Sequence, residues 1–187
     1  GLVNGVLRSL ARAKDAELAP ALAATSEAPQ WFADRLTAAY GADRALAILA
    51  AHRHEAPVDF TVKSDPALWA EKLGGIVLPT SSVRVEKLQA GVTDLPGFAE
   101  GSWWVQDAAA ALPARLFGDI KGLRVADLCA APGGKTAQLI LAGANVTAVD
   151  TSKNRLARLE QNLMRLGLSA ELAQTDLLDY RPAELFD

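Results

Sequence analysis

From residue 124 onward, hydrophobic and polar positions follow two alternating patterns. Short apolar runs at 124–129, 145–149 and 170–173 are separated by helical periodicity at 135–141 and 152–166. Such runs are typical of buried strands, and spacings of three and four residues are typical of helices. Strands interleaved with helices predict right-handed βαβ units around a parallel sheet. We therefore predict an α/β fold for residues 106–187, with a truncated parallel sheet.

Residues 29–105 carry shorter patterns that predict a small α+β module. Alternating and short apolar runs predict strands at 58–62, 76–78, 83–85 and 103–105. Helical periodicity from residue 29 predicts a hairpin of two helices, the first of which stops at Gly41. Asp65-Pro66 is an N-cap followed by a proline at the first helical position, which opens a further helix.

Two further helical segments flank this module. Residues 1–14 place apolar side chains on one stripe, and the Ala-rich stretch 16–28 is a short helix or a linker, so residues 1–28 are interpreted as the end of a helical domain. Residues 108–117 are a predicted helix that Asp107 caps and Pro113 bends or interrupts. The chain thus divides into predicted segments at 1–28, 29–105 and 106–187.

Four tryptophans are candidates either for the core or for stacking on unpaired bases. For Trp31 and Trp69 the helical spacing favours the core. Trp103 and Trp104 are neighbours in a predicted strand, so their rings point to opposite faces and only one can lie in a given core. We expect one of this pair to have a surface role.

Composition narrows the class of protein. Half of the 187 residues are apolar, and no apolar run is long enough to span a membrane. We expect a soluble, cytoplasmic protein that does not bind membranes. One cysteine and two histidines supply neither an internal disulfide nor a structural zinc site, so no metal is expected.

The net charge of −3 argues against binding nucleic acid by bulk charge alone. Two local clusters of basic residues remain, and each is interpreted first as a solvated helix face, although either could contact phosphate. The clusters are Arg8, Arg12 and Lys14, and Lys153, Arg155, Arg158 and Arg165.

The residues that carry candidate chemistry follow the first strand of the predicted sheet. Val125 to Thr136 reads as an apolar strand, a turn of small residues and the start of a helix, which predicts a site for a polar ligand at a helix N-terminus. We expect Gly133 and Gly134 to be needed because a Cβ there would keep the ligand from the backbone. Asp127, Asp150 and Asp176 lie in or after successive strands, so they are predicted to converge on one crevice, with a carboxylate after the second strand suited to a ribose diol.

Other nucleotide sites fit this stretch less well. A phosphate-binding loop needs a glycine four residues before Gly134-Lys135-Thr136, and Cys129 stands there, at a position needed for the turn. The glycine pattern of Rossmann dehydrogenases is absent. A nucleotide phosphatase therefore remains an alternative to a nucleoside cofactor that brings no phosphate.

Several motifs resemble the Sun/Fmu-type RNA cytosine-5 methyltransferases. These are Asp127-Leu-Cys-Ala-Ala-Pro-Gly-Gly-Lys-Thr136, Val149-Asp150, Arg155-Leu156 through Asn162-Leu163 to Arg165-Leu166-Gly167, and Asp176. Similarity extends upstream to the segment that precedes the cofactor domain in the family. The similar residues are Leu95-Pro96-Gly97-Phe98, Gly101 and Val105-Gln106-Asp107. The stretch from Gly1 to Arg8 resembles the end of the antiterminator-like RNA-binding domain of its ribosomal RNA enzymes.

The resemblance implies a Rossmann-like, S-adenosylmethionine-dependent methyltransferase domain after a small RNA-recognition-like module. It implies that the cofactor's methionine part is surrounded by Cys129, Ala130, Ala131, Pro132, Gly133, Gly134 and Lys135. It further implies that Asp150 holds the ribose hydroxyls and that Asp176 lies by the adenine amino group. The substrate would be carbon 5 of a cytosine in RNA, with ribosomal RNA the expected class, and the chain is expected to be a monomer.

The family's catalytic residues have no counterpart in this chain. An Asp-Ala-Pro-Cys segment and a second cysteine are expected beyond Asp187, so the chain is expected to be an inactive fragment. Cys129 is the only thiol, and it lies in the cofactor loop, so we interpret it as a small packing residue and cofactor contact rather than a nucleophile. A second alternative is an RNA-binding or ribosome-assembly module with a vestigial cofactor pocket.

Overall fold

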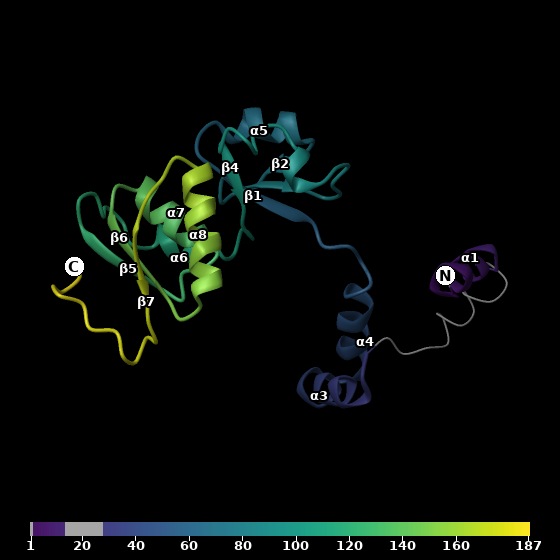
Figure 1. Cartoon of the computed structure of the whole chain (residues 1–187). Helices are drawn as coiled ribbons and strands as arrows, with labels where there is room; N and C mark the ends of the chain where they lie inside the picture. Colours follow the sequence, from purple (N-terminus) through teal and green to yellow (C-terminus); the bar gives the residue numbers. More distant parts are fainter. Residues whose placement is uncertain (1, 14–27) are drawn as a thin grey trace. The chain divides into compact units, whose positions relative to one another are not determined.

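A computed structural model describes residues 2–13 and 28–187 of the chain (Figure 1). Contacts divide it into two compact units, Gly1–Glu55 and Ala56–Asp187. The helical hairpin therefore groups with the N-terminal unit, whereas it was predicted to group with the strands at 58–105. The division into domains at 28/29 and 105/106 stays a prediction, and the interpretation of 16–28 falls largely outside the described residues.

The N-terminal unit contains helices α1 (Leu2–Arg12), α3 (Gln30–Tyr40) and α4 (Ala42–Ala51). Gly41 ends α3 as predicted, with φ 81° and its N–H donating to the Thr37 carbonyl at 2.9 Å. The predicted core position of Trp31 is wrong, because its side chain is 63% exposed. Helix α3 has no buried residue, so within the described residues no further layer covers the face that carries Trp31.

The second unit begins with an antiparallel sheet in the order β2-β3-β1-β4. Its elements are β1 (Val58–Val62), α5 (Pro66–Leu73), β2 (Ile76–Val77), β3 (Val83–Val85), the short 3₁₀ helix η2 (Val92–Asp94) and β4 (Trp103–Val105). As predicted, Asp65 caps α5, its Oδ1 accepting from the Leu68 N–H at 3.1 Å. Helix α5 packs Trp69 and Leu73 onto Phe60 and Val83 of the sheet, which confirms the predicted core position of Trp69.

Both members of the tryptophan pair in β4 are buried. Trp103 is 0% exposed and packs edge-on against Phe60, with 4.8 Å between the ring centroids. Trp104 is 6% exposed and belongs to the core of the parallel sheet. The predicted opposite orientation of the rings is confirmed, but the surface role for one of them is wrong. The reason is that β4 lies between two hydrophobic cores, so each face of the strand has its own.

The rest of this unit is a parallel sheet in the order β5-β6-β7, which confirms the Rossmann-like α/β fold. Its elements are β5 (Arg124–Leu128), α7 (Gly134–Leu141), β6 (Asn145–Asp150), α8 (Lys153–Arg165) and β7 (Glu171–Gln174). Both helices cover one face (Figure 1), where Ala137 and Leu159 pack against Ala148. Because the strands are parallel, their carboxyl ends meet at one edge of the sheet.

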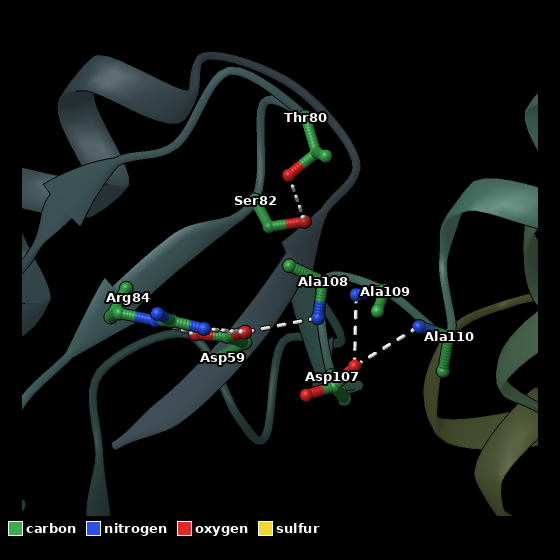
Figure 2. A network of polar contacts seen from close by, with 8 residues as sticks. All are labelled: Asp59, Thr80, Ser82, Arg84, Asp107, Ala108, Ala109 and Ala110. Atoms are coloured by element: carbon green, nitrogen blue, oxygen red, sulfur yellow. Dashed lines mark hydrogen bonds and ion pairs between the residues drawn. The ribbon is translucent and has the colours of Figure 1, made fainter. Parts of the chain in front are cut away.

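The predicted helix over 108–117 is mostly wrong. Residues 108–111 form turns, and only α6 (Leu112–Arg115) is helical. Asp107 does accept the expected backbone hydrogen bonds through Oδ1, from Ala109 at 2.8 Å and Ala110 at 3.0 Å (Figure 2). Pro113 lacks an N–H and is tolerated only in the first turn of a helix, so α6 begins next to it and does not extend back through residues 108–111.

A buried carboxylate on β1 holds the segment that connects the two sheets. Asp59 accepts from Arg84 Nε at 2.7 Å and Nη2 at 2.8 Å, and from the Ala108 N–H at 2.9 Å (Figure 2). The hydrogen bond from Arg84 lowers the pKa of Asp59; burial opposes this shift, and the Ala108 N–H and the guanidinium charge add to it. Asp59 thus fixes the point at which the chain leaves β4 for the parallel sheet.

The variant Asp59→Asn is expected to lower the free energy of unfolding by about 2 kcal/mol at pH 7, because it removes a charge-assisted pair. A folded-state pKa below the unfolded value of about 3.9 stabilises the fold above that pH, and this stabilisation is lost as pH falls through the folded pKa. The difference in the free energy of unfolding between wild type and variant should therefore become smaller below about pH 4. Urea denaturation at stepped pH measures it, with exposed Asp179→Asn as control. An equal difference in the free energy of unfolding at pH 7 and at pH 3 would contradict the stabilising role of the Asp59 carboxylate.

Candidate functional site

A cleft of about 580 Å³ lies at the carboxyl end of β5. Three parts of the second unit form its walls: the loop after β5, the segment around β4, and the C-terminal half of α8. The lining residues are Phe98, Trp104, Val105, Gln106, Asp107, Ala110, Asp127, Leu128, Cys129, Ala130, Ala131, Pro132, Gly133, Gly134, Lys135, Asn162, Arg165 and Leu166. All seven residues of the predicted loop, 129–135, are among them.

The loop turns the chain from β5 into α7 within a few residues. Cys129 takes the left-handed φ of 61°, after which the Ala130 N–H donates to the Val149 carbonyl at 3.0 Å. Gly133, at φ 101°, then caps α7, and its N–H donates to the Ala130 carbonyl at 2.8 Å. The first N–H groups of a helix have no intrahelical acceptor, so the start of α7 offers donors to a ligand in the cleft.

The two loop glycines pack closely against neighbouring side chains. A Cβ on Gly133 would lie 3.0 Å from Leu159 Cγ, and one on Gly134 would lie 3.3 Å from Gln106 Cδ. Their small size therefore lets α8 and Gln106 pack against the loop. That a Cβ at either position would also keep a ligand from the backbone stays a prediction.

Asp150 lies beside a second, smaller pocket of about 50 Å³, lined by Cys129, Val149, Asp150, Thr151, Arg155, Thr175 and Leu177. The Asp150 carboxylate is buried: Oδ1 accepts from the Ser152 N–H at 3.0 Å, and Oδ2 accepts from the Ala131 N–H at 3.3 Å. The two pockets share Cys129, so they adjoin one another. Asp150 belongs to the smaller one.

Asp176 lies outside the lining of both pockets. It is exposed, and its Oδ1 accepts from the Leu178 N–H at 2.9 Å, while its neighbours Thr175 and Leu177 line the smaller pocket. The structure therefore brings together the loop and Asp150 but not the Asp176 side chain. Its role beside an adenine stays a prediction.

Cys129 is exposed, so its predicted role as a packing residue is wrong. The left-handed conformation places it on the wall of both pockets instead of in the core. Positive φ is strained for a residue with a Cβ, and such strain is found at functional sites. The same geometry weakens one argument against a phosphate loop, because cysteine does adopt the turn that was expected to need glycine.

Asp127 supplies a buried carboxylate to the cleft. It is 8% exposed, and its Oδ2 accepts from the Thr136 hydroxyl at 2.6 Å. Burial raises the pKa of Asp127, while the Thr136 hydrogen bonds and the Lys135 charge oppose the shift. A carboxylate and a helix N-terminus in one cleft suit a ligand with both a positive and a negative group.

The walls contain residues whose roles the sequence pattern did not identify. Gln106 Oε1 accepts from Thr61 at 2.9 Å and Trp104 at 2.8 Å, and its Nε2 donates to Gln138 at 2.7 Å. This buried amide joins β1 and β4 to α7 directly beneath the loop. A glutamine beside two tryptophans at a strand end was the available signal.

Arg165 also departs from its predicted solvated position. Its Nη1 donates to the carbonyls of Phe98 at 2.8 Å and Trp103 at 3.1 Å, and the guanidinium lies 4.2 Å from the Phe98 ring. Burial lowers its pKa. Lys63 Nζ donates to the Leu166 carbonyl nearby. These contacts fasten the end of α8 to the antiparallel sheet and so fix one wall of the cleft.

Within residues 2–13 and 28–187, no group of three or more His, Cys, Asp or Glu side chains is placed to hold a metal ion. No helix in the same described part is long and apolar enough to cross a membrane.

Comparison with known proteins identifies the family. The family model for 16S rRNA methyltransferase RsmB/F matches residues 120–187. The ribosomal RNA small subunit methyltransferase B of Serratia proteamaculans is 38% identical over 189 residues, which cover 94% of this chain and 44% of that protein. Its counterpart in Pseudomonas syringae pv. tomato is 37% identical, with 94% and 42% covered. Residues 120–187 carry the RsmB/F methyltransferase domain, and 94% of the chain is similar to named members of that family. It spans less than half the length of these relatives.

Solved structures agree with the family fold. A methyltransferase homolog protein from Pyrococcus horikoshii superposes with a TM-score of 0.67 at 27% identity, covering 81% of this chain and 54% of that one. NSun6 from the same organism, solved with SFG, gives a TM-score of 0.66 at 17% identity, covering 79% and 65%, and shows the fold alone. The resemblance to Sun/Fmu-type methyltransferases is thus confirmed at the level of the family.

Proposed function

We propose that this chain forms the S-adenosylmethionine-binding part of an enzyme that methylates carbon 5 of a cytosine in RNA, with ribosomal RNA as the substrate class. The observation that carries the proposal is the cleft at the carboxyl end of β5, where the loop 129–135, the buried Asp127 and the start of α7 lie together. The match of residues 120–187 to the RsmB/F family supports the reaction.

The chemistry of the donor set fits this cofactor. Its amino-acid end carries an ammonium and a carboxylate, which suit Asp127 and the N–H groups that open α7. Its sulfonium is a second cation, for which a buried carboxylate is a favourable neighbour. Asp150, at the end of β6, is the acceptor suited to ribose hydroxyls in the smaller pocket. The cofactor, when bound, supplies an electrophilic methyl group.

The residues of this chain bind and orient; none is proposed as the nucleophile. Cys129 lies on the wall between the two pockets, within the loop that would surround the cofactor. The attacking cysteine is proposed to belong to the part of the enzyme beyond Asp187. A target cytosine must leave its stack to reach the methyl group, so we propose an unpaired or flipped base as substrate. A cytoplasmic, monomeric protein remains part of this proposal.

A nucleotide phosphatase is the less favoured function. In a phosphate-binding loop the threonine after the lysine holds a magnesium ion. Here the Thr136 hydroxyl donates to Asp127 at 2.6 Å, inside the strand-to-helix turn. The match to a methyltransferase family model over the same residues also favours the cofactor.

Calorimetric titration tests the proposal. S-adenosylhomocysteine, the product form of the cofactor, is expected to bind the 187-residue chain with a dissociation constant in the micromolar range, about −8 kcal/mol. ATP with magnesium is the matched nucleotide control and is expected to give no heat. A folded sample that binds ATP and not S-adenosylhomocysteine would favour the phosphatase. Salt-dependent RNA binding without cofactor binding would favour a vestigial pocket.

A further inference from the structure

Arg155 connects the two pockets through the loop between them. It is the third residue of α8, and its Nη2 donates to the Ala131 carbonyl at 2.6 Å. The same nitrogen lies 3.3 Å from Asp150 Oδ2. Asp150 in turn accepts from the Ala131 N–H. The amide N–H and the carbonyl of Ala131 are therefore held by an acid and a base that also contact one another.

The stability of helix α8 does not account for this arginine. Helix α8 has no acidic residue in its first turn and begins with Lys153 and Arg155, although cations are unfavourable at a helix N-terminus. The Arg155 side chain is 54% exposed, whereas the Asp150 carboxylate that it pairs with is only 1% exposed, so the arginine compensates a buried charge. A residue that breaks a rule of its own helix in order to pair with an acid of the smaller pocket is a candidate for a role in the site.

The pocket beside Asp150 has a size that indicates what enters it. Its volume of about 50 Å³ has room for roughly three or four water-sized groups. This is enough for a pair of hydroxyls at the edge of a sugar and too small for a whole nucleoside. The Asp150 carboxylate is the buried acceptor there, and Arg155 lines the same pocket.

We propose that Arg155 is a positioning residue: by clamping Asp150 and the Ala131 carbonyl together, it orients the Asp150 carboxylate toward the vicinal hydroxyls of a ribose. This rests on the proposed function, because it assigns the ribose of the cofactor to the smaller pocket. Arg155 itself does not need to contact the ligand. Its contribution should therefore appear only with ligands that carry the hydroxyl that Asp150 accepts.

The experiment compares two ligands by calorimetry with the 187-residue chain: S-adenosylhomocysteine and its 2′-deoxy analogue. In the wild type, loss of the hydroxyl is expected to weaken binding about tenfold. In Arg155→Met the affinity for S-adenosylhomocysteine should fall about tenfold. The ratio between the dissociation constants of the two ligands should then shrink to about twofold. Arg155→Lys keeps the cation and should restore part of the ratio.

Arg158→Met is the matched control, since Arg158 lies one turn further along the exposed side of the same helix and its loss changes the net charge equally. It should keep the wild-type ratio. The ratio is internal to each variant, so a partly unfolded sample does not alter it. An Arg155→Met variant with the wild-type ratio would overturn the positioning role while leaving the proposed function standing. A folded wild type that binds neither ligand would overturn both.

Discussion

Replacing Trp103 by alanine is expected to lower the free energy of unfolding of the second unit by about 3–5 kcal/mol. The side chain is fully buried against Phe60 and Phe98, with ring centroids 4.8 Å and 5.8 Å away. Its Nε1 donates to the Pro96 carbonyl at 2.9 Å. Truncation leaves a cavity in the antiparallel core and an unpaired acceptor, two costs that add.

Trp31→Ala is the matched control, because it removes the same side chain from a position that is 63% exposed. Its effect should stay below about 1 kcal/mol. Urea denaturation followed by far-ultraviolet circular dichroism measures both, since fluorescence would change with the loss of either tryptophan. Equal destabilisation by the two substitutions would contradict the assignment of Trp103 to the core and of Trp31 to the surface.

The elements of the parallel sheet were predictable because each depends on a local pattern. Strands β5, β6 and β7 are short apolar runs, and the helices between them have helical periodicity. The cap at Asp65 and the stop at Gly41 depend on only a few neighbouring residues. Local signals of this kind survive folding because tertiary contacts reinforce them.

Burial was harder to predict because it depends on which layers cover an element. Trp31 has helical spacing that suits a core, yet nothing in the described part of the chain covers it. One of Trp103 and Trp104 was expected at the surface because a single sheet has one core, whereas β4 is shared by two. The failed helix at 108–117 has a local cause, since Pro113 outweighs the alanine-rich pattern around it.

The residues of the site also differ in this respect: local patterns predict some of them, and contacts between distant segments place the others. The strand-to-helix pattern predicts a ligand-binding turn after β5, the family resemblance assigns residues 129–135 to it, and all of them line the cleft. Gln106 and Arg165 complete the walls through contacts with residues more than thirty positions away, as in the bonds to Gln138 and Phe98. No periodicity encodes such contacts. Asp176 shows what a local pattern cannot predict. Its position after a strand predicts proximity to the crevice, but not the direction of its side chain.

Asp150→Ala is expected to weaken binding of S-adenosylhomocysteine on the order of 100-fold, because two hydroxyl hydrogen bonds to a carboxylate contribute about 1.5 kcal/mol each. The substitution also leaves the N–H groups of Ala131 and Ser152 without their acceptor. We expect the fold to lose about 1–3 kcal/mol as a consequence. Calorimetry gives the affinity, and urea denaturation gives the stability.

Asp150→Asn separates the two effects, because an amide oxygen still accepts one backbone N–H while the charge that strengthens the ribose contact is lost. It should retain most of the stability and still bind at least tenfold more weakly than the wild type. Asp179→Asn is the matched control at an exposed acid that lines neither pocket and has no predicted role in binding, and it should change the affinity less than threefold. If Asp150→Asn binds S-adenosylhomocysteine as tightly as Asp179→Asn does, the assignment of Asp150 as the ribose acceptor is wrong.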